Sequence, residues 1–499
     1  MSQYILAIDQ GTTGTTSMLI DHGGFAVAKV NKEFPQIFPK PGWVEHDPED
    51  IWQSVTETIG LVIAKAGVNP HDIAAIGITN QRETVTIWSR ETNRPVHNAI
   101  VWQCRRTTDF CEKLKKAGQA RKIAKKTGLV IDPYFSASKI RWLLKNVDGA
   151  EARARRGELA AGTIDSFLVW RLSGGKKHVT DVSNASRTQL MNIETGEWDD
   201  ELLKLFGGVP RALLPEIVNS SGEIAKTKSV PGLPDGIPIA GMAGDQQAAL
   251  FGQTCFGSGD AKCTFGTGSF LLMNTGAKRV ASKSGILTTI AWRLQGETKM
   301  TYALEGGAFI CGAAVQWLRD GLKLITRSSE IEDLARQVSD SAGVDFVPAL
   351  TGLGAPYWDP EARGIITGLT RGSTSAHLAR ATLDAMAMQN LDILRAMQKD
   401  LGHKLRSLRV DGGATANNLL MQLQADYLGQ AIERPRMIET TAIGAAFLAG
   451  LGVGLWKNKN DLKSAWHLDQ RFEPKMLKKE QAKRVDQWHR AIDRARGAL

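Results

Sequence analysis

A pattern of an apolar strand, a turn of glycine and threonine, and a returning strand occurs twice in the chain, near the start of each half. The first copy spans 4–9, 10–16 and 17–21, and the second spans 260–265, 266–269 and 270–274. Such a turn exposes backbone N–H groups and hydroxyls without bulky side chains, which suits close approach to phosphate oxygens. Asp9, at the end of the first strand, could hold a metal ion through water. The recurrence predicts a duplicated domain with nucleotide phosphates held between the copies.

The length of the chain agrees with a duplication. At 499 residues it is too long for one hydrophobic core, and we expect two domains, residues 1–252 and 253–499. Apolar strands alternate with segments of helical spacing, so the expected fold class is α/β. The clearest helices are expected at 48–66, where Asp47 supplies a cap and Pro48 starts the first turn, and at about 375–401.

The stretch around Asp245 lies between the two copies and carries a single carboxylate. The run from Ile237 to Ala243 is short enough for a buried strand, Gly244 permits a tight turn, and helical spacing resumes at Gln246. Ligands in open α/β sheets bind at the carboxyl ends of strands, so Asp245 could act as a general base. Aspartate is also a favoured helix N-cap, and the stretch alone favours that interpretation. The surrounding hairpins and an Arg-Glu pair upstream favour the general base.

Two further motifs follow predicted strands. Arg82 and Glu83 come soon after the apolar run 73–78, and together they offer a fork of donors and a carboxylate acceptor, as vicinal hydroxyls require. A surface ion pair explains the same two residues equally well. Asp411-Gly412-Gly413 ends the strand predicted at 405–410. Glycines there could let an adenine or ribose ring approach the backbone, and a plain strand-to-helix turn is the alternative.

Charge and cysteine usage exclude several classes of protein. The net charge of +10 could indicate an anionic partner, but the basic clusters at 113–126 and 475–496 have apolar residues at helical spacing, which favours solvated helix faces over a nucleic-acid surface. Five scattered cysteines indicate reduced thiols in a cytoplasmic protein. The uncharged run 440–456 falls short of a membrane span and is interpreted as a buried helix ending in a glycine-rich turn. Neither a Walker A motif nor the protein-kinase motifs are present.

Four motifs resemble those of the FGGY sugar and polyol kinases of the actin-like ATPase superfamily: Asp9-Gln10-Gly11-Thr12-Thr13, Gly244-Asp245-Gln246-Gln247, Gly266-Thr267-Gly268 and Asp411-Gly412-Gly413. Longer runs at 41–48, 80–83, 99–106 and 352–358 are similar to those of the glycerol kinases within that family. The resemblance covers nearly the whole chain. It implies two actin-like, ribonuclease H-like domains with a cleft between them, and ATP-dependent phosphorylation of glycerol to sn-glycerol 3-phosphate.

The resemblance also implies which residues contact each ligand. The glycerol contacts fall on Arg82, Glu83, Trp102, Tyr134, Asp245, Gln246 and Phe270. The ATP contacts fall on Thr12, Thr13, Gly14, Thr267, Gly312, Gln316, Gly413 and Asn417. Mg²⁺ is expected with the nucleotide, and Asp9 is its candidate ligand. The resemblance further implies a cytoplasmic homo-oligomer, a dimer or a tetramer, with no nucleic-acid partner and no membrane insertion.

Two positions depart from the pattern of the family. Thr16 stands where many relatives have an arginine near the phosphates, so Mg²⁺ and the hairpin amides are expected to neutralise more of the transferred charge. The Gly-Gly-Lys-Gly-Gly loop with which some bacterial relatives bind a sugar bisphosphate inhibitor is missing from 226–236. That form of feedback is therefore not expected.

Two other functions remain open. A kinase for another polyol or sugar would share the hairpins and Asp245, but not the set formed by Arg82, Glu83, Trp102 and Phe270. An ATP-gated scaffold of the actin or Hsp70 type would need a polymer interface or an appended peptide-binding domain, which is not expected after the last helical segment.

Overall fold

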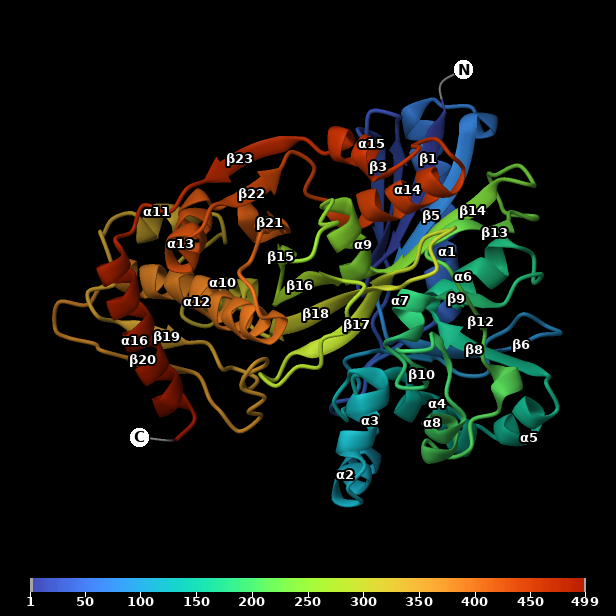
Figure 1. Ribbon diagram of the computed structural model, residues 1–499, viewed down its shortest axis with the longest axis horizontal. Helices are drawn as coiled ribbons and strands as arrows, with labels where there is room; N and C mark the ends of the chain where they lie inside the picture. The colour runs from blue at the N-terminus through green and yellow to red at the C-terminus, as the bar shows by residue number, and fades with distance from the viewer. Residues whose placement is uncertain (1–2, 498–499) are drawn as a thin grey trace.

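The computed structural model describes residues 3–497 and contains two large sheets side by side, one from each half of the chain (Figure 1). The first sheet has the strand order β13-β14-β5-β1-β2-β3. Its strands, in chain order, are Tyr4–Gln10 (β1), Gly14–Ile20 (β2), Ala26–Glu33 (β3), Ile73–Asn80 (β5), Ser221–Lys226 (β13) and Pro238–Gly244 (β14).

The second sheet repeats this topology, with the strand order β17-β18-β16-β15-β21-β22-β23. Its strands are Asp260–Phe265 (β15), Ser269–Gly276 (β16), Leu287–Trp292 (β17), Thr301–Ala308 (β18), Ser407–Asp411 (β21), Ile432–Pro435 (β22) and Leu468–Phe472 (β23). In each sheet the first strand, β1 or β15, pairs antiparallel with its hairpin partner and parallel with a later strand, β5 or β21. Apart from the extra edge strand β17, the two sheets match in strand order and direction, although β13 precedes its partner β14 in the chain and β23 follows its partner β22. The predicted duplication is therefore confirmed.

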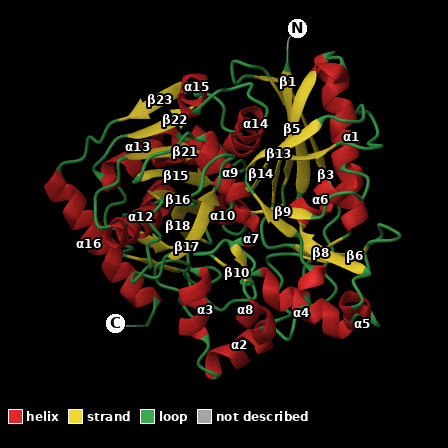
Figure 2. Cartoon of the chain, turned by 45° about the vertical axis from the view of Figure 1, so that its right-hand side comes forward, coloured by secondary structure: helices red, strands yellow, loops and turns green. Residues whose placement is uncertain are grey.

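Shorter strands and the helices surround the two sheets (Figure 2). A four-stranded sheet contains Glu45–His46 (β4), Val85–Ser89 (β6), Ala99–Ile100 (β7) and Leu159–Thr163 (β8). There are also three two-stranded sheets. They pair Val179–Asp181 (β9) with Glu216–Val218 (β12), Met191–Asn192 (β10) with Glu197–Trp198 (β11), and Asp345–Val347 (β19) with Ile365–Thr367 (β20). The helices are Pro48–Ala66 (α1), Thr108–Lys116 (α2), Ala120–Thr127 (α3), Ser136–Asn146 (α4), Ala150–Arg155 (α5), Ile164–Leu172 (α6), Val182–Ala185 (α7), Asp200–Leu205 (α8), Asp245–Gly252 (α9), Gly312–Asp320 (α10), Glu330–Ala335 (α11), Ser375–Leu401 (α12), Asn418–Leu428 (α13), Thr440–Gly452 (α14), Lys459–Ala465 (α15) and Lys478–Ala495 (α16). Single 3₁₀ turns lie at Pro70–Asp72, Arg211–Leu213 and Gly413–Ala416.

Helix α1 covers one face of the first sheet and has the bounds that its sequence predicts. The Asp47 side chain accepts a hydrogen bond from the N–H of Glu49 at 2.8 Å, and Gly67 ends the helix with a φ of 63°. Both features are typical of helix ends. The apolar side of α1, which includes Ile51 and Val55, packs with Leu6 and other residues of the sheet in one buried cluster.

Helix α14 covers the opposite face of the first sheet, although it belongs to the second half of the sequence (Figures 1 and 2). Glycines in the sheet permit this close approach. A Cβ atom at Gly77 would lie 2.1 Å from the carbonyl oxygen of Ala445, and one at Gly241 would lie 2.3 Å from the nitrogen of Ala449. The buried helix predicted within 440–456 is confirmed.

Helices α9 and α14 also touch each other through glycines. A Cβ at Gly444 would lie 1.8 Å from the carbonyl oxygen of Ala248, and one at Gly252 would lie 2.1 Å from that of Thr440. Because these are backbone atoms within helices, no side-chain rotation can relieve such an overlap.

We expect Gly444→Ala to lower the free energy of unfolding by about 2 kcal/mol or more, because α9 and α14 must separate to admit the methyl group. Gly60→Ala is the matched control. Gly60 lies within α1 and has no atom within 4 Å of its Cβ position, so alanine should stabilise that helix by up to about 1 kcal/mol. Denaturant unfolding followed by tryptophan fluorescence measures both. Equal stability of the two variants would contradict the helix contact.

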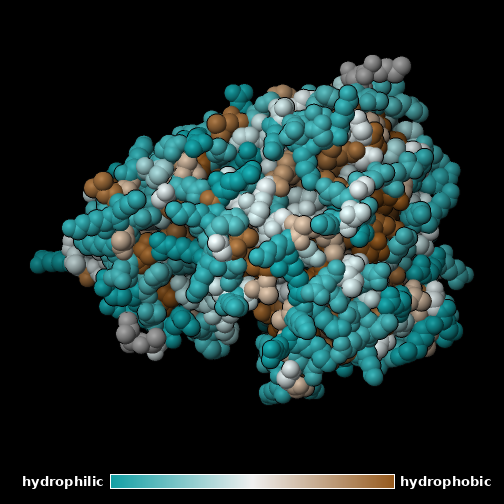
Figure 3. Space-filling model, in the orientation of Figure 1, coloured by the Kyte–Doolittle hydropathy of each residue, from teal (hydrophilic) through white to brown (hydrophobic). Residues whose placement is uncertain are grey.

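The surface is indented between the two halves. Figure 3 shows a notch at the lower edge of the molecule, between the part formed by the second half and the lobe that carries α2 and α3. No helix within residues 3–497 combines the length and the apolar character needed to cross a membrane. All five cysteines are buried and free.

The turn of the first hairpin is shorter than its sequence predicts. The glycine and threonine run was expected to form a turn over 10–16, but β2 already begins at Gly14. Thr15 and Thr16 pair with Gln10 and Asp9 in the ladder between β1 and β2, so only 11–13 form the turn. Consequently Asp9 lies within β1, directly opposite Thr16.

Candidate active site

Arg82 and Glu83 form a tight turn shortly after β5. The N–H of Thr84 donates to the carbonyl of Arg82 at 2.7 Å, and Glu83 has a φ of 61°, a left-handed conformation that residues other than glycine seldom adopt. Backbone strain of this kind is concentrated at functional sites. Arg82 and Glu83 are only 3% and 1% exposed, so the alternative of a surface ion pair is wrong.

The Arg82 guanidinium is the centre of a buried network of ion pairs. Its terminal nitrogens donate to the two carboxylate oxygens of Glu305 at 2.6 and 2.9 Å. Arg187 donates to Glu83 at 2.7 Å and to Glu305 at 3.0 Å. Burial acts to raise the pKa of Glu305, but the charges of Arg187 and Arg82 outweigh burial and lower that pKa to about 2. Glu305 is therefore ionised, and it joins β18 of the second sheet to two arginines of the first half.

Sequence reasoning identified neither Glu305 nor Arg187 as a site residue. Arg187 follows the short helix α7, and Glu305 lies in the middle of β18. The only local signal is a charged residue within a run of small and apolar residues, as in Ala303-Leu304-Glu305-Gly306-Gly307. Such a signal indicates burial but does not identify the partner.

Asp245 is the first residue of α9 and directly follows β14. Gly244 occupies the N-cap position, because β14 continues through Gly244 before the helix begins, so the interpretation of Asp245 as the cap is wrong. The Asp245 carboxylate accepts a hydrogen bond from the N–H of Gln246 at 2.6 Å and lies 3.1 Å from Nε of Arg82. Its side chain is 33% exposed, so a bound molecule can reach it. A general base needs this combination of fixed position and access.

Two aromatic residues connect this network to the first hairpin. The Tyr134 hydroxyl lies 3.4 Å from Arg82, and the Tyr134 ring meets the Trp102 ring edge to face at 5.6 Å. The Trp102 indole N–H donates to the Thr12 hydroxyl at 2.9 Å. Contacts and chain neighbours thus bring together Arg82, Glu83, Trp102, Tyr134, Asp245 and Gln246. Phe270 lies on β16 opposite Gly307, on the strand pair that also carries Glu305.

The second hairpin is joined to the start of α10. The N–H of Gly312 donates to the carbonyl of Gly266 at 2.9 Å, and the N–H of Ala313 donates to that of Thr267 at 3.0 Å. A Cβ at Gly312 would lie 2.6 Å from the Gly266 oxygen, so a larger residue would separate the helix from the hairpin. Gln316 lies on the exposed side of the same helix.

The glycine turn after β21 approaches the same hairpin. Gly412 has a φ of 89°, and a Cβ there would lie 2.6 Å from the carbonyl oxygen of Phe265. Gly413 is exposed and has no atom within 4 Å of its Cβ position, so its surface is accessible to a ring. Asn417 caps α13 by accepting from the N–H of Leu420 at 2.8 Å. Its Oδ1 is thus used within the protein, which leaves the side-chain NH₂ for a ligand. Thr13 and Thr267 are exposed at the two hairpin tips, and Gly14 begins β2.

Asp9 is close enough to Asp245 for their charges to interact. Burial, followed by the negative charge of Asp245, raises the pKa of Asp9 to about 7. A cation near both carboxylates would relieve this repulsion. Within residues 3–497 there is no group of three or more His, Cys, Asp or Glu side chains that could hold a metal ion. A cation here would therefore take further oxygen ligands from a bound molecule or from water.

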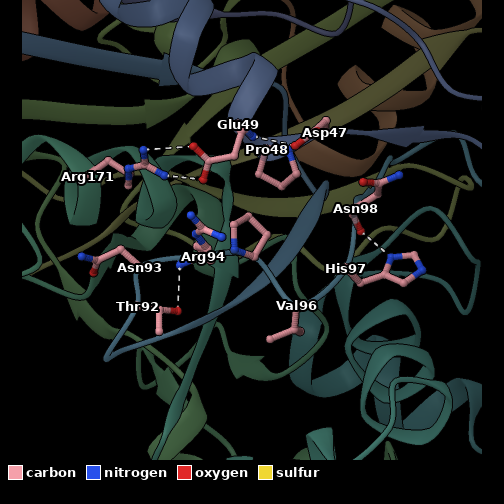
Figure 4. Close-up of a pocket in the computed structure, with 11 residues that line it drawn as sticks. Asp47, Pro48, Glu49, Thr92, Asn93, Arg94, Val96, His97, Asn98 and Arg171 are labelled. Carbon is pink, nitrogen blue, oxygen red and sulfur yellow. Dashed lines mark hydrogen bonds and ion pairs between the residues drawn. The ribbon is translucent and has the colours of Figure 1, made fainter.

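A cavity of about 710 Å³ lies elsewhere, between the N-terminus of α1 and the loop 92–98 (Figure 4). Arg171 and Glu49 in its wall form two hydrogen bonds with each other, at 2.6 and 3.1 Å, so their charges are already paired. None of the residues assigned above to the candidate active site lines this cavity, and we do not assign the cavity to that site.

A sheet of this topology, present twice, is typical of the actin-like ATPase fold, and the accessible carboxylate of Asp245 fits an enzyme of the kinase class within that fold. The comparison with known families is more specific. The chain belongs to the FGGY family of carbohydrate kinases, whose N-terminal domain matches residues 4–252 and whose C-terminal domain matches residues 261–453.

Individual relatives match over almost their full length. The chain is 61% identical over 494 residues to a glycerol kinase from Bdellovibrio bacteriovorus and 55% identical over 496 residues to glycerol kinase 2 from Thermotoga maritima, with 99% of each chain covered in both comparisons. Among solved structures, it is similar to Plasmodium falciparum glycerol kinase with ADP. That match has a TM-score of 0.94 and 39% identity, and it covers 99% of this chain and 98% of the other.

Proposed function

We propose that this enzyme transfers the γ-phosphoryl group of ATP to a terminal hydroxyl of glycerol, giving sn-glycerol 3-phosphate. The observation that carries the proposal is the accessible Asp245 carboxylate, which Arg82 holds at 3.1 Å beside the buried Glu83. The identity of 61% to a glycerol kinase over nearly the whole chain supports glycerol as the acceptor.

Asp245 takes the proton of the glycerol hydroxyl as its oxygen attacks the phosphorus atom. Transfers of this kind depend mainly on positioning and on electrostatic stabilisation. The nitrogens of Arg82 all face protein acceptors, and the 3.4 Å contact with Tyr134 is the longest of its hydrogen bonds. A glycerol hydroxyl would most easily replace that contact. One carboxylate oxygen of Glu83 accepts a hydrogen bond from Arg187. The other oxygen accepts no hydrogen bond from residues 3–497, so this oxygen can accept one from glycerol.

The remaining predicted contacts divide between the two ligands. Trp102, Phe270 and Gln246 complete the glycerol site. The two hairpins carry Thr12, Thr13, Gly14 and Thr267 for the phosphates, and α10 and the turn after β21 carry Gly312, Gln316, Gly413 and Asn417 for the rest of the nucleotide.

Mg²⁺ fits beside Asp9 of the first hairpin, because the negative charge of Asp245, at the start of α9, also acts there. Asp9 would hold the ion through water, and the ion would supply positive charge to the phosphates. The oligomeric state stays a prediction, a dimer or a tetramer.

A substrate panel tests the proposed function. Purified protein is given ATP and, in turn, glycerol, erythritol, xylulose and water alone, and ADP release is recorded. We expect the highest kcat/KM with glycerol. A preference for xylulose or erythritol would assign the site to another polyol or sugar, and ADP release that does not depend on an acceptor would indicate an ATPase.

A further inference from the structure

Lys262 is a fully buried lysine within the second sheet. It lies in β15, the first strand of the second hairpin, and its side chain is 0% exposed. Lysine is almost never fully buried unless a carboxylate pairs with it. Lys262 forms no ion pair with any carboxylate of residues 3–497, so its position needs another explanation.

The Lys262 ammonium contacts the candidate active site directly. Its Nζ donates to Oε1 of Gln246, the residue next to Asp245, and to the Thr264 hydroxyl at 2.8 Å. An ammonium has three N–H donors, and buried donors are normally all satisfied. The third donor of Lys262 has no acceptor among residues 3–497. Because the side chain is 0% exposed, a bound group reaches this donor only when the surrounding residues move.

Charged neighbours locate Lys262 between the two ligand sites. Burial lowers the pKa of Lys262, whereas the charges of Asp411 and Asp245 act to raise it. Asp411 precedes the glycine turn of the nucleotide site, and Asp245 is the base of the glycerol site. Asp411 does not require the lysine as a partner, because Gln253 and Thr440 both donate to its carboxylate at 2.7 Å.

Because the two sheets have the same arrangement, equivalent positions in the two hairpins can be compared. Asp9 and Thr264 occupy equivalent places, each two residues before the glycine that opens its turn, Gly11 or Gly266. Both turns are closed by a backbone hydrogen bond of 2.9 Å, from the N–H of Gly11 to the carbonyl of Gly14 and, across one residue fewer, from the N–H of Gly266 to the carbonyl of Gly268. The first half thus presents a carboxylate at this place, and the second half presents a hydroxyl bound to an ammonium.

The turns themselves supply no positive charge. Residues 10–16 and 266–269 include neither lysine nor arginine, and Thr16, opposite Asp9, is neutral. The arginines of the glycerol site, Arg82 and Arg187, are already paired with carboxylates. Among residues 3–497, Lys262 forms no ion pair with a carboxylate. Lys139, beside Tyr134, forms none either, but its ammonium donates to the carbonyls of Tyr134 and Phe135.

We propose that the Lys262 ammonium binds an equatorial oxygen of the transferred phosphoryl group and stabilises the negative charge on that group during its transfer from ATP to glycerol. The proposal rests on the proposed function. The bond between the γ-phosphorus and the bridging oxygen of ADP breaks, and its electron pair stays with ADP. A bond forms from the glycerol oxygen to phosphorus, the hydroxyl proton passes to Asp245, and Lys262 keeps its protons throughout. Charge-assisted hydrogen bonds of this kind are strongest in a site that excludes water.

Three variants test this role. Lys262→Met removes the charge, and we expect kcat to fall by about 10² to 10³-fold, as for loss of one preorganised donor. Lys262→Gln also removes the charge but can still donate to Gln246 and Thr264, so it should be almost as slow. Thr264→Val keeps the ammonium and removes one anchor, so its kcat should fall much less. A Gln variant with normal kcat would show that only the hydrogen bonds matter, and would overturn the proposal.

Nucleotide binding measured without glycerol supplies a second readout. We expect Lys262→Gln to weaken binding of the triphosphate analogue AMPPNP by about tenfold and to leave the affinity for ADP within about twofold. Equal losses for both nucleotides would indicate a purely structural lysine and contradict the proposal. If Lys262→Met does not fold, Lys262→Gln carries the test. Wild-type protein that releases no ADP with glycerol would refute the proposed function, while the AMPPNP and ADP affinities would still decide whether Lys262 contacts the γ-phosphate.

Discussion

Replacing Asp245 with asparagine is expected to lower kcat by about 10²-fold or more, the range for loss of a general base. The change is nearly isosteric, and the amide oxygen can still face Nε of Arg82, which lies 3.1 Å from the carboxylate. Glycerol binding should therefore change little, and the loss should appear in kcat rather than in KM. Single-turnover experiments with glycerol and ATP separate the chemical step from product release.

Asp199→Asn is the matched control for that variant. Asp199 also stands at the start of a helix, where it caps α8 through the N–H groups of Glu201 and Leu202. Asparagine caps a helix as well as aspartate does, so this variant should keep its kcat. Its stability should fall slightly, because the ion pair of Asp199 with Lys126 at 2.7 Å is lost. A comparably active Asp245→Asn enzyme would remove Asp245 from the role of base.

Truncating Arg82 to alanine should raise the KM for glycerol by about 10²-fold, because loss of one partner from a buried charge network costs several kcal/mol. Glu305 would keep Arg187, but Asp245 would lose the cation that orients it, so kcat should fall as well. Affinity for ADP should be nearly unchanged, since the predicted nucleotide residues lie on other elements. Steady-state kinetics in glycerol, together with calorimetry of ADP binding, measures both effects.

Two other arginine variants show whether the effect comes from geometry or from charge. Arg82→Lys keeps one positive charge but cannot bind both oxygens of Glu305, so it should behave more like the alanine variant than like wild type. Arg156→Ala removes an exposed partner of Glu158 and should alter neither KM nor kcat. Parallel weakening of glycerol and ADP binding by Arg82→Ala would argue for general unfolding rather than for a glycerol contact.

Local signals were sufficient for much of the fold. Capping residues and apolar spacing located α1 at its bounds, and the repeated hairpins predicted two sheets of one topology, because both features depend on residues close together in the chain. The predicted length of the first turn was wrong, because Thr15 and Thr16 pair with residues of β1, and this pairing depends on partners across the ladder.

The site residues also differ in whether their role depends on nearby or on distant parts of the sequence. Arg82, Glu83 and Asp245 stand next to strand ends, where sequence patterns are informative. Glu305 pairs with arginines far away in the sequence, and Lys262 donates to Gln246 on another element. A single charged residue inside a strand does not reveal which partner it meets, so neither could be assigned from sequence alone.

The position of α14 has a consequence for synthesis on the ribosome. The first sheet is complete in sequence at β14, yet one of its faces is covered by a helix that begins only at Thr440. During translation that apolar face stays exposed until most of the second half has been made. The nascent first half therefore needs protection from aggregation, and a chain terminated after residue 252 would expose the surface that α14 normally covers.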